Sequence, residues 1–268
     1  MLIANVMAET ATNFLDGDLN SLTATTAWLG MLAYTFQIYF DFSGYSDIAI
    51  GIALMLGYRL KENFDNPYNS QNITVFWRKW HISLSQWLRD YIYIPLGGNR
   101  KGVFMMYLFL MTTMLIGGLW HGADWKFVFW GMGHGLLLIL HKLLYPQKAS
   151  SNKFLKFSGV LLTFHLVAVL WIFFRSSSIE ASFESIRKII TENNFREIIA
   201  FGLARPEVLI LIFLAALITF TPNFYKQKIF SNFLMLPLYL WPFIIIVLLQ
   251  LIIQFRDNTI QPFIYFQF

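Results

Sequence analysis

The residues best suited to chemistry in this chain are histidines set in apolar surroundings. Three of the five histidines, His121, His134 and His165, interrupt or end long apolar runs. Ionisable side chains are costly inside a membrane and usually face the interior of a helix bundle or a water-filled cavity. A neutral imidazole in that setting can act as a general base. The alternative for each histidine is that it packs and donates one ring hydrogen to a backbone carbonyl.

His121 has the most distinctive neighbours, in the stretch GGLWHGADW. The glycines around it can break a helix and let an extended ligand approach the backbone closely. Trp120 and Trp125 are suited to walling a narrow apolar channel, although aromatic residues at a membrane boundary are equally expected as interfacial anchors. We therefore predict a functional site at His121, with Gly118, Trp120 and Gly122 beside a bound ligand.

Other catalytic chemistries find less support in the residues. His134 and His141 share a helix face, but no cysteine, HExxH motif or nearby carboxylate completes a zinc site, so we expect no metal. The absence of cysteine also excludes thiol nucleophiles and disulfides. A Ser-His-Asp triad is compatible with the composition, but no GxSxG motif occurs. Asp41 and Asp47, in YFDFSGYSD, are expected to accept structural hydrogen bonds.

The elements that must position these residues are membrane helices. The 268 residues are 57% hydrophobic and only 13% charged, about half the charged share of a soluble domain. A spanning helix needs about 20 apolar residues, and six runs come close, at residues 22–40, 103–120, 127–144, 159–174, 208–221 and 233–255. A seventh run, residues 44–58, is short and carries Asp47, which suggests a tilted or broken helix. We predict an all-α integral membrane protein with about six spanning helices, forming one membrane domain over residues 1–268.

Two segments between these runs are amphipathic at helical period. Residues 74–91 place three tryptophans on one face and basic residues on the other, which predicts a helix in the membrane interface. The second segment follows the cap signal of three serines ending at Ser178. Its apolar face collects Ile179, Phe183, Ile186 and Ile190. Both segments could equally be helices packed on a neighbour.

The charge distribution indicates partners and orientation. The formal charge is +5, and the basic residues lie between apolar runs, which fits lipid headgroups and not a nucleic acid. Their excess on one side of the alternating later runs predicts that this side is cytoplasmic. The N-terminal stretch MLIANVMAETATNF has no secretory signal pattern, so insertion is expected to rely on internal segments.

Three stretches carry a family resemblance. The sequences YFDFSGYSDIAIG, NFDNPYNSQNITVFWRKWHISLSQWLRDYIYIPLGGNR and GGLWHGADWKFVFWGMGHG resemble the membrane-bound O-acyltransferase family, and within it the bacterial alginate O-acetyltransferase branch. The similarity runs from near the N-terminus to the closing PFIYFQF. Members of this branch are usually longer, with further spanning helices at the start, so the chain looks like the C-terminal half of the family unit.

This resemblance implies residue roles and substrates. The family's essential histidine, in a Trp-His-Gly motif, corresponds to His121 as general base, and a second histidine corresponds by its TFH context to His165, which would orient the thioester carbonyl or stabilise the oxyanion. Apart from the resemblance, His134 is predicted beside the substrate, with a structural role as the alternative. The expected donor is cytoplasmic acetyl-CoA, with no tightly bound cofactor. The expected acceptor is an extracytoplasmic polysaccharide or an acetyl-relaying partner protein, and the expected location is a bacterial cytoplasmic membrane, crossed several times.

Three alternatives stay open at this point. A transporter or channel would use the histidines to relay protons, but the sequence has no evident inverted repeat or paired broken helices. A catalytically incomplete fragment would serve a partner as a membrane scaffold. The near alternative within the family resemblance is D-alanyl transfer to teichoic acid.

Overall fold

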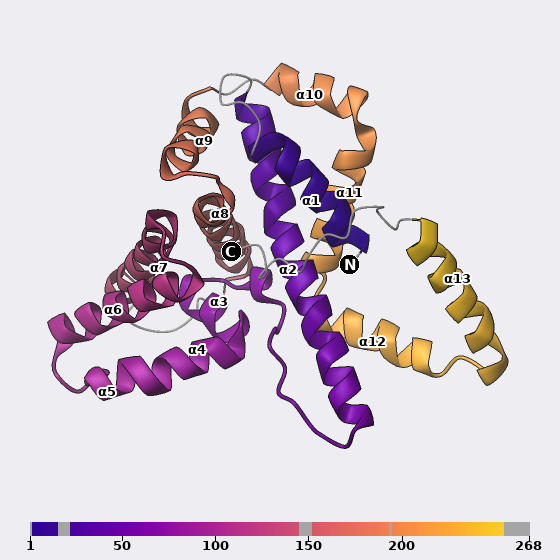
Figure 1. Ribbon diagram of the computed structural model, residues 1–268, viewed down its shortest axis with the longest axis horizontal. Coiled ribbons are helices and arrows are strands. Elements are labelled where there is room, and N and C mark those ends of the chain that lie inside the picture. Colours follow the sequence, from indigo (N-terminus) through magenta and orange to yellow (C-terminus); the bar gives the residue numbers. More distant parts are fainter. Residues whose placement is uncertain (1, 16–21, 145–151, 193–194, 255–268) are drawn as a thin grey trace.

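The computed structural model describes residues 2–15, 22–144, 152–192 and 195–254, and within these ranges every regular element is helical (Figure 1). This confirms the all-α class. In chain order the elements are α1 (Leu2–Leu15), α2 (Ala24–Met55), η1 (Pro67–Asn69), α3 (Ile73–Lys79), α4 (Ile82–Leu88), η2 (Arg89–Tyr93), α5 (Ile94–Leu96), α6 (Val103–His121), α7 (Trp125–Leu144), α8 (Lys153–Arg175), α9 (Ile179–Thr191), α10 (Phe195–Ala204), α11 (Pro206–Phe220), α12 (Asn223–Leu234), η3 (Leu238–Leu240) and α13 (Trp241–Gln254).

The described helices provide three to five candidate spans, fewer than the six expected. Helices α6, α7 and α8 are each long and apolar enough to cross a membrane. Two bent pairs could each form one broken span: α10 with α11, bent by 100°, and α12 with α13, bent by 94°. The runs at 22–40 and 44–58 merge into the single helix α2, along which polar residues such as Gln37 and Asp41 recur. Residue 255, at the end of the last expected run, lies outside the described residues, as does the closing PFIYFQF.

Helix α2 is the central rod of the fold. A capping box begins it: the Thr23 hydroxyl accepts the Thr26 N–H at 3.2 Å, and the Thr26 hydroxyl accepts the Thr23 N–H at 3.0 Å. Its N-terminal half is buried among α1, α8, α9 and α11, whereas Ile52 and Met55 near its C-terminal end are 55% and 88% exposed. In Figure 1 this end projects beyond the helices that surround the other half. The core therefore sits around the first half of α2.

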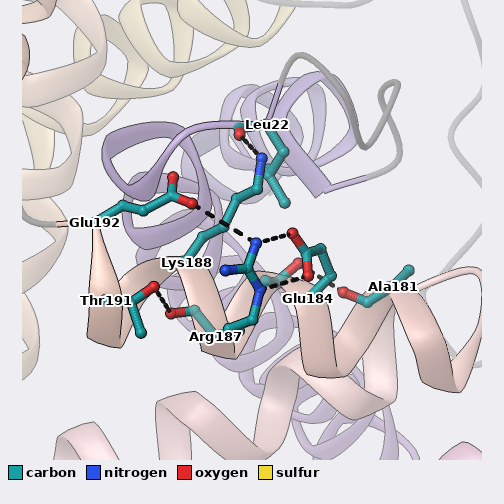
Figure 2. A network of polar contacts seen from close by, with 8 residues as sticks. Leu22, Ala181, Glu184, Arg187, Lys188, Thr191 and Glu192 are labelled. Carbon is teal, nitrogen blue, oxygen red and sulfur yellow. Dashed lines mark hydrogen bonds and ion pairs between the residues drawn. The ribbon is translucent and has the colours of Figure 1, made fainter.

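Helix α9 confirms the expected cap at Ser178, whose hydroxyl accepts the Ala181 N–H at 3.1 Å. Figure 2 shows how polar contacts hold this helix: Arg187 donates to Glu184 at 2.6 and 2.8 Å, and Lys188 donates to the backbone carbonyl of Leu22, just before α2. The helix packs against α2, α7 and α8. The segment was expected to lie in the membrane interface or to pack on a neighbouring helix, and the structure favours the packed helix.

The single helix expected over residues 74–91 is divided in the structure. Helix α3 ends at Lys79, and α4 begins after His81, whose φ of 43° is left-handed. Trp80 is buried, whereas Trp87 and Tyr91 are 48% and 69% exposed. The expected apolar face is therefore not one continuous surface, because the left-handed residue changes the chain direction between α3 and α4.

Tyr68, in the 3-10 turn η1, ties three elements together. Its hydroxyl donates to the Thr35 carbonyl of α2 at 2.8 Å and accepts the Trp171 indole N–H of α8 at 3.1 Å. Both bonds are buried. Tyr68 therefore fixes the segment that leads into α3 against the core.

We expect the Tyr68→Phe substitution to destabilise the protein by about 1–3 kcal/mol, because it leaves the buried Trp171 N–H without its acceptor. Thermal unfolding in detergent measures this loss. Tyr239, which is 78% exposed, offers the matched control Tyr239→Phe. Equal unfolding midpoints for the two variants would contradict the structural role given to the Tyr68 hydroxyl.

Candidate functional site

His121 ends α6 inside an aromatic enclosure. Its imidazole is half-buried, with ring centroids 4.9 Å from Trp120, 5.2 Å from Trp130 and 4.9 Å from Phe174, all edge to face. Phe127 lies further off, at 6.4 Å. Aromatic pairs favour such edge contacts, so the rings hold the imidazole in one orientation. The residue predicted as catalytic thus has restricted contact with water and a defined position.

The GADW part of the motif forms the tight turn that builds this enclosure. The Asp124 carboxylate accepts the Lys126 N–H at 3.0 Å, and the Asp124 carbonyl accepts the Phe127 N–H at 3.1 Å, which starts α7 directly after α6. The Lys126 ammonium then donates to the Ser176 carbonyl at 3.1 Å. Because Ser176 follows the last turn of α8, this bond holds the α6–α7 turn close to Phe174.

The two glycines predicted beside the substrate, Gly118 and Gly122, lie against α7. A Cβ on Gly118 would lie 2.3 Å from the Phe127 carbonyl oxygen, and one on Gly122 would lie 2.5 Å from the Phe127 ring. Residues of α7 therefore occupy the space that a side chain would need at either glycine. The missing side chains let α6 and α7 approach each other closely, and the place of Gly118 and Gly122 beside the substrate stays a prediction.

Trp120 has ring contacts with two histidines. Its indole is 55% exposed and has ring-centroid distances of 4.9 Å to His121 and 6.4 Å to His81. The two imidazoles are also near enough to interact electrostatically. The prediction that Trp120 lies beside the reacting group fits this position. Trp125, in contrast, is 69% exposed.

His81 is a candidate functional residue that the sequence reasoning missed. It occupies the left-handed position between α3 and α4, and its ring packs edge to face on Phe42 of α2 at 4.7 Å. His81 lies outside the candidate spanning helices, and burial lowers its pKa to about 4, so the imidazole is neutral near pH 7. Histidines in apolar runs stand out in the sequence, whereas His81 lies in a more polar segment. The signal for His81 was its place inside WRKWHISLS, a stretch that carries the family resemblance.

His134 lies one layer deeper than His121, on α7. It is 0% exposed, its Nδ1 accepts the Trp77 indole N–H at 3.3 Å, and its ring centroid is 4.7 Å from that of Trp130. An indole N–H can only donate, so the hydrogen of the neutral imidazole is on Nε2. That Nε2 and the Trp130 Nε1 have no hydrogen-bond partner among the described residues. Because the rings of His134 and His121 both contact Trp130, His134 stays a candidate for a place next to the substrate.

The remaining histidines lie apart from this group. His165 is exposed on α8, and among the described residues its contacts stay within that helix: Nδ1 is 2.8 Å from the Leu161 carbonyl, and its ring centroid is 5.4 Å from that of Phe164. The structure thus does not bring His165 together with His121. His141 contacts the Thr74 hydroxyl at 2.9 Å and so helps α3 lie along α7.

The acidic residues do not join the histidine group into a metal centre. Asp41 is half-buried and Asp47 is exposed, both on α2. In the part of the chain that the structure describes, no three histidine or carboxylate side chains lie together in a way that could hold a metal ion. The arrangement thus offers proton transfer and hydrogen bonding at neutral imidazoles.

Comparison with known proteins gives a consistent picture. The model of MBOAT, membrane-bound O-acyltransferase family, matches residues 10–183, which include His81, His121 and His134. The "Probable alginate O-acetylase AlgI" of Pseudomonas putida is 53% identical over 168 residues, 61% of this chain and 33% of the relative. The "Peptidoglycan O-acetyltransferase" of Helicobacter pylori is 41% identical over 193 residues, 70% of this chain and 36% of the relative.

A third relative is less similar to the chain and is named for a different activity. The "Teichoic acid D-alanyltransferase" of Bacillus subtilis is 31% identical over 153 residues, 52% of this chain and 38% of the relative. The chain spans about a third of the length of the curated relatives it matches.

Proposed function

The chain belongs to the membrane-bound O-acyltransferase family, and from this premise we propose that its histidine site takes part in transferring an acetyl group to a hydroxyl of a cell-envelope polysaccharide. The observation that carries the proposal is that the imidazoles of His81 and His121 both contact the Trp120 indole. Two of the relatives described above are named for O-acetyl transfer, which favours acetyl over other acyl groups.

In the proposed reaction His121 is the general base. It accepts the proton of the acceptor hydroxyl while the hydroxyl oxygen attacks the carbonyl carbon of an acetyl thioester. The carbon–sulfur bond then breaks, and the departing thiolate takes that proton to become a thiol. The products are an O-acetyl ester and a free thiol, and His121 is neutral again. Its aromatic enclosure limits water, which would otherwise hydrolyse the thioester.

His81 is proposed as the second imidazole of this site. The family resemblance suggested His165 for that position, but the hydrogen-bond and ring contacts of His165 lie within α8, whereas His81 and His121 both contact Trp120. A neutral His81 can accept a hydrogen bond from a second hydroxyl of the acceptor and so orient the reacting hydroxyl, whose own proton goes to His121. His134, buried behind Trp130, would support the site from the α7 side.

The finer features of the proposal concern donor, acceptor and location. The proposed donor is cytoplasmic acetyl-CoA, and the proposed site is in the cytoplasmic membrane of a bacterium. The acetyl group would reach the polysaccharide directly or through a partner protein on the outer side. D-alanyl transfer to teichoic acid is the second candidate, because of the similarity to the Bacillus subtilis enzyme.

Ester analysis of a deletion strain tests the proposal. Acetate and D-alanine released by mild alkali from the isolated envelope polysaccharides are compared between the deletion strain, the wild type and a complemented strain. We expect the deletion to remove ester-linked acetate and leave D-alanine unchanged. Loss of D-alanine alone would favour the second candidate, and unchanged amounts of both esters would contradict acyl transfer to the envelope.

The two candidates for the second histidine can be separated by mutation. We expect His81→Ala to lower acetyl transfer by about 10²-fold, because the acceptor is no longer held in the attack geometry. Acetyl transfer by His165→Ala should stay within about threefold of wild type. His165 is exposed and lies apart from the site, and replacing such a side chain usually has little effect. Acetyl transfer per folded molecule in isolated membranes measures both. A larger loss for His165→Ala than for His81→Ala would overturn the choice of His81.

A further inference from the structure

The side-chain oxygen of Asn63 lies within hydrogen-bond distance of three atoms of His81 and Ser83. This oxygen, Oδ1, is 3.3 Å from the His81 Nδ1, 3.2 Å from the Ser83 backbone nitrogen and 2.9 Å from the Ser83 hydroxyl oxygen. The backbone carbonyl of Asn63 also accepts the Ile82 N–H at 2.9 Å. One residue, 18 positions before His81 in the chain, thus contacts the histidine and both residues that follow it.

These contacts settle which nitrogen of His81 carries the hydrogen. A backbone N–H can only donate, so the Asn63 atom facing the Ser83 nitrogen must be the amide oxygen and not the amide nitrogen. An amide oxygen can only accept, so the His81 Nδ1 beside it must be protonated. In a neutral imidazole this leaves Nε2 as the nitrogen that can accept a hydrogen.

The Ser83 hydroxyl is compatible with the same assignment. It donates to the Asn63 Oδ1 at 2.9 Å and lies 3.4 Å from the His81 Nδ1. With its hydrogen directed at Asn63, the hydroxyl can only accept from that ring nitrogen. Both oxygens near Nδ1 therefore act as acceptors.

The backbone of His81 also depends on these bonds. In the described part of the chain, His81 and Asn66 are the non-glycine residues with a positive φ. Such a conformation is unfavourable for a residue with a Cβ and persists where the surroundings fix it. The bonds from Ile82 and Ser83 to Asn63 hold the chain directly after the left-handed residue.

We propose that Asn63 is a positioning residue that sets the tautomer and orientation of His81, so that Nε2 is the nitrogen able to accept a hydrogen bond from the bound acceptor while His121 takes the proton of the reacting hydroxyl. The proposal deepens the proposed function and rests on it for its catalytic consequence. The tautomer itself is a property of the folded protein and can be measured without any substrate.

Nitrogen-15 NMR of histidine-labelled protein in lipid nanodiscs tests the tautomer, because protonated and unprotonated ring nitrogens differ strongly in chemical shift. The His81 signals are identified by their loss in His81→Gln. We expect the native protein to carry the hydrogen on Nδ1 of His81. Finding it on Nε2 would overturn the proposal, and this outcome needs no Asn63 variant to fold.

Three variants then separate positioning from a merely structural role. Asn63→Leu keeps the size of the side chain but cannot accept a hydrogen bond, and we expect a mixture of His81 tautomers with about 10- to 100-fold less acetyl transfer. Asn63→Asp restores an acceptor oxygen and is expected to rescue both the Nδ1–H form and most of the activity. The control Ser83→Ala removes a different bond to the same oxygen and should leave the tautomer unchanged.

The outcomes distinguish this inference from the proposed function. If Asn63→Leu loses activity while His81 keeps a single Nδ1–H tautomer, Asn63 is only structural and the inference fails. If the native protein shows the Nδ1–H tautomer but transfers no acyl group to any envelope acceptor, the proposed function fails and the tautomer assignment stands.

Discussion

Replacing His121 with alanine is expected to lower acetyl transfer per folded molecule by about 10²- to 10⁴-fold, the usual contribution of a general base. The imidazole is the ionisable group at the centre of the ring enclosure formed by Trp120, Trp130 and Phe174. Without it, the acceptor hydroxyl would have to lose its proton to a far weaker base. The fold should survive, because the side chain is only half-buried.

The measurement is acetyl transfer in isolated membranes, divided by the amount of folded protein from an unfolding assay. His165→Ala is the matched control, since it removes an imidazole from a helix that packs beside the same core. A His121→Ala variant that kept most of its activity per folded molecule would rule out His121 as the base. A loss of activity that only followed a loss of folded protein would give the residue a structural role.

The second large effect concerns the α6–α7 contact. A Cβ on Gly131 would lie 2.4 Å from the Met114 carbonyl oxygen, and the backbone of α6 cannot give way without separating the helices. Overpacking by single methylene groups already costs about 1–3 kcal/mol, and leucine adds several carbons. We therefore expect Gly131→Leu to remove folded protein from the membrane almost entirely.

Gly51 supplies the matched control for this substitution. It lies within α2, and a Cβ there meets nothing within 4 Å among the described residues. Gly51→Leu should accumulate near the wild-type level, because the added side chain displaces no neighbour and leucine is a better helix former than glycine. Similar amounts of folded protein for Gly131→Leu and Gly51→Leu, measured by size-exclusion chromatography in detergent, would contradict the close α6–α7 packing.

The parts of the fold that follow from local sequence were predictable. Apolar run length predicted α6, α7 and α8, and the serine cap predicted where α9 begins, since both depend on residues close in the chain. The break at His81 was not predictable from periodicity. It depends on hydrogen bonds to Asn63, 18 residues earlier, which no helical pattern encodes. The bends between α10 and α11 and between α12 and α13 could likewise not be predicted from the lengths of the apolar runs.

The candidate site was predictable in part for a similar reason. His121 and Trp120 stand together in one motif, so their proximity is local. His134 and His165 both interrupt apolar runs, yet His134 is 0% exposed while His165 is exposed. The difference depends on which face of each helix meets a neighbour, and that is decided by tertiary packing. His81 reaches the site only because the helix is interrupted between α3 and α4.

Transfer rates of His81→Ala, His121→Ala and the double variant, compared with wild type at equal folded abundance, test most directly whether the two histidines form one catalytic unit. Residues that act as a unit are strongly non-additive. We therefore predict that the double variant is no more than about threefold slower than the slower single variant, because the first substitution already removes the joint function. Losses that multiply in the double variant would show two independent contributions and would contradict a shared site around Trp120.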